Sequence, residues 1–139
     1  RNYLGKISGP LLDRIDLQIE VDNISYGELI DRTSLETSKD VKARADKARE
    51  IQRARFQGTN VSCNAQMTNA MIKKYCQLSD GCEKLLKRAF EKLNLSARAT
   101  TRIIKVARTI ADLDGQKDIS EKHIAEAIQY RSYDRKYHD

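Results

Sequence analysis

The chain is 139 residues long, enough for one domain with a hydrophobic core, or for one domain and part of another. It has a net charge of +6, a single Pro, no Trp, and no apolar run of the ~18 residues that a membrane span needs. These features exclude a membrane span and, with no signal peptide evident, favour a mainly helical protein of the cytoplasm.

The first predicted element is a strand. In RIDLQIEVD, residues 14–22, apolar and polar side chains alternate, which is typical of a strand with one buried face. No second strand is predicted, and one strand cannot satisfy its own backbone hydrogen bonds. We therefore expect it to pair with another copy of the chain, or with a sheet encoded outside this sequence, as in a piece of a longer protein.

A long charged helix is predicted over residues 37–58. Its apolar side chains form a thin seam made of Val41, Ala45, Ala48, Ile51 and Phe56. Gly58 and Asn60 are typical helix terminators.

Four further helices are predicted to form a compact unit over residues 67–131. The first two are expected over 67–79 and 79–95, with inner faces that hold Met71, Ile72, Tyr75 and Cys76 in one, and Leu85, Leu86, Ala89, Phe90 and Leu93 in the other. The third spans 94–115, where Ser96 is a good N-cap and Gly115 a good terminator. The fourth spans 120–132 and is capped by Ser120.

The third helix of this unit has two distinct faces. Its expected core face holds Ile103, Ile104, Ala107, Ile110 and Ala111, and its opposite face holds Arg98, Arg102, Lys105, Thr109 and Asp112. Arg98 falls in the first turn, where the helix dipole disfavours a cation by about 0.3–1 kcal/mol. An arginine at that position therefore needs an explanation.

The positive charge is unevenly distributed. Residues 36–60 carry seven Lys or Arg against four Asp or Glu, and residues 67–95 carry six against three, whereas residues 1–35 sum to −2. The excess fits contact with phosphate or with an acidic neighbour, and it also fits a solvated surface. Because no base-reading chemistry is evident, any DNA contact by this segment is expected to be weak and blind to sequence.

No metal site is expected. The three cysteines, Cys63, Cys76 and Cys82, lack CxxC spacing, and the two histidines, His123 and His138, lie far apart. An odd number of unpatterned cysteines is typical of a reducing compartment.

Two motifs carry a family resemblance. KISGPLLDRIDLQIEV, residues 6–21, and LSARATTRIIKVARTIADLDGQKDISEKHIAEAIQYR, residues 95–131, occur in that order with the charged helix between them. Together they resemble the C-terminal part of magnesium-chelatase-like AAA+ ATPases of the ComM type. The resemblance implies a mainly α fold, a helical AAA+ lid preceded by a remnant of the α/β ATPase core.

The resemblance also divides the chain into segments. Residues 1–24 would be the end of the ATPase core, with its last helix and edge strand, and 25–66 a charged helical insert or linker. Residues 67–131 would be the four-helix lid that carries sensor 2, and 132–139 a polar tail.

The resemblance implies roles for five residues. Arg14 matches the arginine finger, which reaches the γ-phosphate bound by the adjacent subunit, and Arg98 matches the sensor-2 arginine of the lid. A permanently charged, planar guanidinium suits both roles. Arg102 is a further candidate for a phosphate or interface contact, and Asp13 and Asp16 are expected to orient the finger. Without the resemblance, Arg14 could equally pair with Asp13 or Asp16, and Arg98 and Arg102 could be solvated.

The chain has no GxxxxGK[ST] phosphate loop and no acidic strand end for magnesium. We therefore expect ATP and Mg²⁺ to be cofactors of a full-length parent ATPase. This chain alone is expected neither to bind ATP tightly nor to hydrolyse it.

The implied function is that of the lid and arginine-finger part of a ring-forming motor, expected to be a hexamer that remodels DNA in branch migration. Three alternatives stay open at this point. They are the lid of a chelatase-type protein remodeller, an autonomous basic helical module that binds DNA, and a structural helical interaction domain. The unpaired strand argues against an autonomous module.

Overall fold

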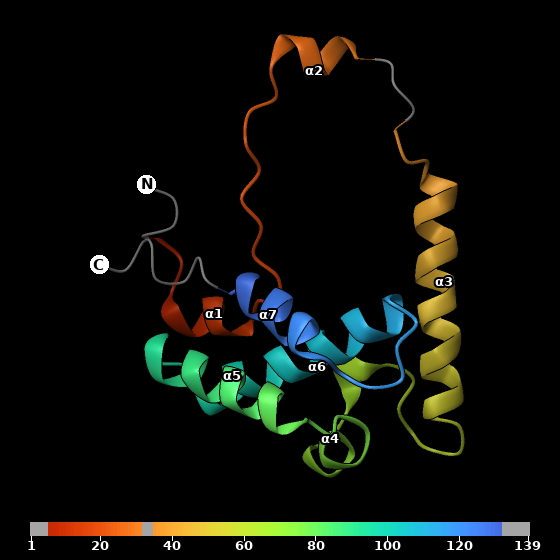
Figure 1. Ribbon diagram of the computed structural model, residues 1–139, viewed down its shortest axis with the longest axis vertical. Helices are drawn as coiled ribbons and strands as arrows, with labels where there is room; N and C mark the ends of the chain where they lie inside the picture. Colours follow the sequence, from red (N-terminus) through yellow and green to blue (C-terminus); the bar gives the residue numbers. More distant parts are fainter. Residues whose placement is uncertain (1–5, 32–34, 132–139) are drawn as a thin grey trace.

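The computed structural model describes residues 6–31 and 35–131. All regular secondary structure in these residues is helical, and no strand is formed among them (Figure 1). This confirms the predicted mainly α fold class. Within the described ranges, no helix combines the length and the apolar character that crossing a bilayer requires. The predicted polar tail at 132–139 lies outside the described residues.

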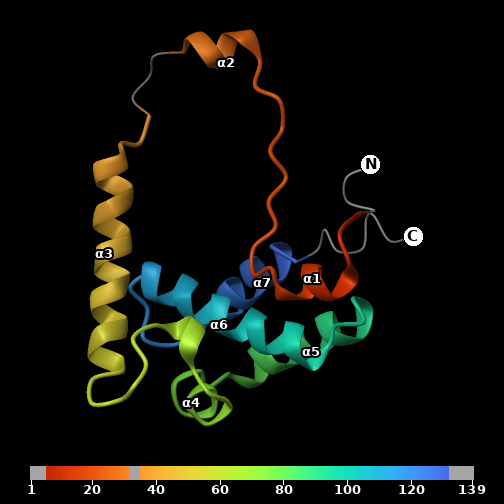
Figure 2. The same cartoon turned by 180° about the vertical axis from the view of Figure 1, so that it is seen from behind.

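The chain begins with a short helix and an extended segment. Helix α1 (Gly9–Arg14) is capped by the Ser8 hydroxyl, which accepts from the Leu11 N–H at 3.3 Å. Residues 17–24 then run without regular structure up to α2 (Tyr26–Ile30) and form one side of an arch above the helical body (Figures 1 and 2).

The strand predicted within residues 14–22 is not formed among the described residues. Its apolar side chains are left in solvent: Leu17, Ile19 and Val21 are 50, 67 and 86% exposed. The alternating pattern is present, but a strand needs a partner ladder, and none of the described residues supplies one.

Helix α2 was not predicted, although its N-terminal signal is present. The Ser25 hydroxyl accepts from the Glu28 N–H, and the Glu28 carboxylate accepts from the Ser25 N–H at 2.7 Å, which is a capping box. The Ser25 N–H and then the Ser25 hydroxyl, at 2.9 Å, lower the pKa of Glu28 by donating to its carboxylate. Tyr26, Leu29 and Ile30 remain exposed at the top of the arch.

The charged helix is α3 (Ser38–Arg55), within the predicted range 37–58. Thr37 and Asp40 form its capping box. The C-terminal part of its apolar seam packs on the lid, where Ala48 and Phe56 are buried, but Val41 is 48% exposed. The N-terminal half of α3 therefore rises beside the body and closes the other side of the arch (Figure 1).

The lid contains the four predicted helices, α4 (Asn69–Tyr75), α5 (Asp80–Lys92), α6 (Ala97–Leu113) and α7 (Glu121–Gln129). Thr68, Ser79 and Ser96 cap the first three. Helix α6 runs through the centre and packs on α7 and α3, and a short 3₁₀ turn, η2 (Asn64–Gln66), lies against it. The core joins Phe56, Met67, Cys76, Cys82, Leu86, Ile103, Ala107, Ala111, Ile119, Ile124 and Ala127.

The three cysteines are free and differ in exposure. Cys76 and Cys82 are buried, whereas Cys63 is half-buried. Burial raises the pKa of the Cys76 thiol to about 11. Because the thiolate is the reactive form, Cys76 is protonated and unreactive at neutral pH.

Alkylation at pH 8 should therefore modify Cys63 first in the folded chain, while Cys76 and Cys82 react only as the protein unfolds. Mass spectrometry of peptides after timed exposure to iodoacetamide measures the three rates separately. The same reaction in denaturant is the control, in which all three should react together. Equal rates for Cys63 and Cys76 in the folded chain would contradict the burial of Cys76.

Candidate functional site

Arg98 lies on the exposed first turn of α6. The Ser96 hydroxyl accepts from the Ala99 N–H at 3.1 Å, so the helix begins directly before Arg98. The Arg98 side chain is exposed, and it forms no hydrogen bond or ion pair with a described residue. The guanidinium is thus free to meet an anion where the backbone N–H groups of a helix end also point.

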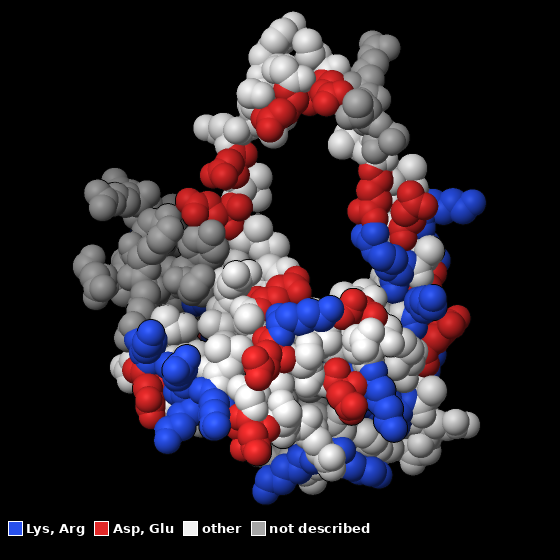
Figure 3. Space-filling model, in the orientation of Figure 1, with Lys and Arg blue, Asp and Glu red and all other residues white. Residues whose placement is uncertain are grey.

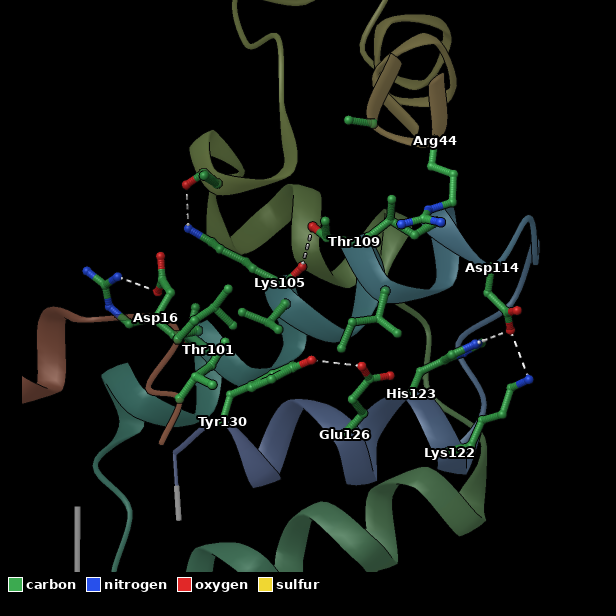
Figure 4. A pocket seen from close by; sticks show the side chains of 18 of the residues that line it. Asp16, Arg44, Thr101, Lys105, Thr109, Asp114, Lys122, His123, Glu126 and Tyr130 are labelled. Atoms are coloured by element: carbon green, nitrogen blue, oxygen red, sulfur yellow. Dashed lines mark hydrogen bonds and ion pairs between the residues drawn. The ribbon is translucent and has the colours of Figure 1, made fainter. Parts of the chain in front are cut away.

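A groove of about 1280 Å³ runs along α6 from this turn. Its walls come from the extended segment at Asp16–Ile19, from α3, and from α7 (Figure 4). Its basic side chains are Arg44, Arg98, Arg102, Lys105 and Lys122, and its acidic ones are Asp16, Asp114 and Glu126. The apolar lining includes Val106, Ile110 and Leu113.

Arg102, one turn after Arg98, is held by Asp16. Its Nη1 lies 2.6 Å from Asp16 Oδ1, and the two side chains are 29 and 47% exposed. The Nε of Arg102 is buried and has no partner among the described residues. The pair therefore connects α6 to the extended segment, and Arg102 is engaged where Arg98 is not.

Arg14 ends α1 and is exposed, without a hydrogen bond or ion pair to a described residue. The two aspartates expected to orient it contact other groups. Asp13 Oδ2 accepts a 3.3 Å hydrogen bond from the Ser96 hydroxyl, and Asp16 binds Arg102. The carboxylates thus tie residues 13–18, hereafter the finger segment, to the start of α6.

Arg131 and Tyr130 make three further hydrogen bonds that sequence reasoning missed. The Arg131 guanidinium donates to the carbonyls of Asp13 and Ile15, each at 3.0 Å. The Tyr130 carbonyl accepts from the Gln18 N–H at 2.9 Å. The end of α7 therefore holds the finger segment by its backbone, an interaction that leaves no signal in side-chain patterning.

A buried polar cluster joins α3 to the C-terminal end of α6. Arg55 donates to both Asp112 oxygens, at 2.8 and 2.5 Å, and Asn64 donates to Asp112 at 2.9 Å. Arg108 lies 3.2 Å from the same carboxylate. The hydrogen bonding that Arg55 donates to Asp112 is the largest cause that raises the pKa of Arg55.

This cluster corrects the prediction that Asp112 faces away from the core. Its side chain is fully buried, because α3 and η2 cover the end of the polar face of α6. Arg98, at the other end of that face, stays exposed.

His123 has a structural position at the far end of the groove. Its Nδ1 accepts from the Ser120 N–H at 3.0 Å, so Nε2 carries the proton and donates to Asp114 at 2.8 Å. This bond, followed by that from Lys122, lowers the pKa of Asp114. Among residues 6–31 and 35–131, no three His, Cys, Asp or Glu side chains converge in a way that could hold a metal ion.

Two protein-family models match this chain. Residues 35–131 match the family model described as magnesium chelatase, subunit ChlI C-terminal, and residues 1–29 match that of magnesium chelatase, subunit ChlI. Both motifs described above therefore fall within regions that family models recognise.

Similar proteins are found in several bacteria. Competence protein ComM of Haemophilus influenzae is 44% identical over 94% of this chain and 25% of its own length. The uncharacterized protein YifB of Escherichia coli is 39% identical over 96% of this chain and 26% of its own. The uncharacterized protein Rv2897c of Mycobacterium tuberculosis is 31% identical over 94% of this chain and 26% of its own.

The chain thus spans about a quarter of the length of these curated relatives. The C-terminal family model covers well over half of the chain itself. The protein therefore belongs to the magnesium chelatase subunit ChlI C-terminal family.

Proposed function

We propose that this chain is the arginine-finger segment and sensor-2 lid of a cytoplasmic, ring-forming AAA+ ATPase. In this proposal Arg98 contacts the phosphates of ATP from the lid, and Arg14 reaches the γ-phosphate held by the adjacent subunit. The exposed Arg98, without a partner among the described residues at the N-terminal turn of α6, carries the proposal.

The position of Arg98 suits an anion for two reasons. A helix N-terminus presents backbone N–H groups and partial positive charge, which favour a phosphate and disfavour an isolated cation. The guanidinium adds a planar pair of donors that can contact two phosphate oxygens together. The phosphate offsets the cost of placing a cation there.

ATP and Mg²⁺ fit this site only in part. Arg98 can hold phosphate oxygens, whereas Arg102 and Lys105 on the next turns bond Asp16 and the Ala65 carbonyl. The sequence has neither a phosphate loop nor an acidic strand end for the metal. The remaining ligands would come from residues in the part of the relatives that this chain does not span. Bound Mg·ATP would supply the phosphoryl group, while this chain would stabilise the charge that develops on it.

Replacement of Arg98 by Ala in the intact ATPase should lower the rate of ATP hydrolysis by about 10², the scale for removing one preorganised donor from a reacting oxygen. Steady-state phosphate release at saturating ATP measures the effect. Arg53→Ala is a matched control, because Arg53 is an exposed arginine on α3 outside the groove. If Arg98→Ala is as active as Arg53→Ala, Arg98 does not contact the nucleotide.

A second proposal concerns the substrate, which we take to be DNA, with a protein as the alternative. Lys84, Lys87, Arg88 and Lys92 are exposed on α5, and none of them forms an ion pair with a described residue. Figure 3 shows basic side chains gathered on this side of the helical body, with acidic ones beside them. On α3, Lys42 pairs with Asp46 and Arg44 with Glu36, whereas Lys39, Lys47, Arg49 and Arg53 are exposed without an ion pair to a described residue. We propose these unpaired cations of α5, which lie on the same helix as Asp80, Glu83 and Glu91, as the contact with a phosphate backbone.

Duplex DNA should bind the chain weakly, with an affinity that falls steeply as salt is raised. The double substitution Lys87→Gln/Arg88→Gln should lower the salt-dependence slope by about 2, one unit for each lost phosphate contact. Titration of a fluorescent duplex at several salt concentrations gives both numbers. Lys42→Gln/Arg44→Gln, which removes equal charge from α3, is the control, and an equal effect of the two variants would exclude a specific role for α5.

A further inference from the structure

Arg131 is a buried arginine that donates to the backbone on both sides of Arg14. Its Nη1 bonds the Ile15 carbonyl and its Nη2 bonds the Asp13 carbonyl, both at 3.0 Å. Arg131 is 2% exposed and follows directly on the end of α7. Arg131 thus bonds the backbone on both sides of Arg14, the residue proposed as the finger, without contacting the Arg14 side chain.

Two bonds from one planar guanidinium fix the relative position of two acceptors. Because Arg131 holds the carbonyl of the peptide unit before Arg14, and the Ile15 N–H of the unit after it donates to the Leu12 carbonyl at 3.1 Å, the direction in which the Arg14 Cβ leaves the backbone is held as well. The Arg14 side chain has no partner among the described residues that could orient it instead. The direction in which the Arg14 side chain points is therefore set by the backbone.

We infer that Arg131 is a positioning residue for Arg14, and that it aims the finger by clamping residues 13–15 to the end of α7. This inference rests on the proposed role of Arg14 as an arginine finger. Three other contacts act in the same direction, because Gln18, Asp13 and Asp16 of the finger segment bind Tyr130, Ser96 and Arg102 of the lid. The lid and the finger segment of one chain consequently move as one body.

The chain contains a matched control for Arg131. Arg108 is 3% exposed, and its guanidinium also donates to two backbone carbonyls, those of Lys117 at 2.9 Å and Gln116 at 3.0 Å. In both arginines Nε is buried without a partner among the described residues. Arg108, however, holds the loop between α6 and α7 and lies 3.2 Å from Asp112, and it does not bond the finger segment.

The test uses mixed rings of two subunit types in the intact ATPase. A donor subunit keeps Arg14 but cannot bind ATP because of a substitution outside this chain. An acceptor subunit binds ATP but carries Arg14→Ala. Hydrolysis then occurs where a donor finger faces an acceptor nucleotide, so a substitution can be placed on the finger side or on the nucleotide side alone.

Arg131→Gln in the donor should reduce this hydrolysis by about 10², because a displacement of the reacting groups by about 1 Å has an effect of that size. The same substitution in the acceptor should reduce the rate of hydrolysis by a factor at least ten times smaller, since the acceptor finger is already absent. Arg131→Lys in the donor should recover part of the loss, because an ammonium can still bond one carbonyl. Arg108→Gln should reduce activity by the same factor on either side.

Hydrogen exchange supplies a readout independent of activity. The Gln18 amide should exchange faster in Arg131→Gln than in Arg108→Gln, because the clamp lies beside its bond to Tyr130. Equal losses for Arg131→Gln in donor and acceptor would overturn the positioning role and leave the finger proposal intact. Full activity of homogeneous Arg14→Ala rings would instead overturn the finger proposal, and the inference with it.

Discussion

Rings of the intact ATPase made only of Arg14→Ala subunits should hydrolyse ATP about 10³ times more slowly, the scale seen when a finger arginine is removed from a phosphoryl-transfer site. In the proposed finger role, the loss would arise because the guanidinium neutralises charge that develops on the transferred phosphoryl group. ATP affinity and thermal stability should change little, since Arg14 is exposed and bonds no described residue. Arg14→Lys should recover little activity, because a point charge on a flexible stem cannot reproduce the two-point contact.

Phosphate release, ATP titration and thermal melting on the same preparation separate these effects. Arg49→Ala, at another exposed arginine on α3, is the control and should retain full activity. Mixing Arg14→Ala subunits with subunits that cannot bind ATP should restore part of the hydrolysis if the finger acts across the interface. No recovery in rings shown to be mixed would place Arg14 in a structural role instead.

The lid helices could be predicted from local signals because their ends are chemically marked. Ser79 and Ser96 accept hydrogen bonds from the first turns of α5 and α6, and Gly115 has the positive φ of 66° that ends a helix. The stripe of Ile103, Ala107 and Ala111 is fully buried, as its periodicity predicts. Such signals lie within a few residues of the structure that they specify.

The features that could not be predicted depend on partners distant in the sequence. The alternation at Leu17 and Ile19 describes two faces of a strand, but it cannot supply the neighbour that would make the strand form. The same limit applies to Asp112, which reads as a surface carboxylate on a helical wheel. It is buried because α3, whose Arg55 lies 57 positions earlier, packs over it.

The candidate site also has parts that could be predicted from the sequence and parts that could not. Arg14 and Arg98 were identified by resemblance to a motif, and their roles stay predictions until activity is measured. The contacts that position them are Asp13 with Ser96, 83 positions apart, and Arg131 with Ile15, 116 positions apart. Half of these bonds go to backbone carbonyls, which every residue has, so side-chain identity on the acceptor side carries no information about them.

Asp112→Ala should lower the free energy of unfolding by about 3–5 kcal/mol, the range for removing one partner of a buried ion pair. The Asp112 side chain is fully buried, and Arg55 at 12% and Arg108 at 4% side-chain exposure would both lose their counter-charge. Asn64 would lose an acceptor as well. Asp112→Asn should recover part of the loss, because an amide oxygen can still accept one hydrogen bond but carries no charge.

Urea denaturation of the chain, followed by circular dichroism, measures the change. Asp46→Ala is the matched control, because Asp46 pairs with Lys42 on the exposed part of α3, where ion pairs contribute little. A double-mutant cycle of Arg55→Met with Asp112→Ala should show strong coupling, since each single variant removes both hydrogen bonds between the two side chains. If Asp112→Ala unfolds at the same urea concentration as Asp46→Ala, the buried cluster does not stabilise the packing of α3 on the lid.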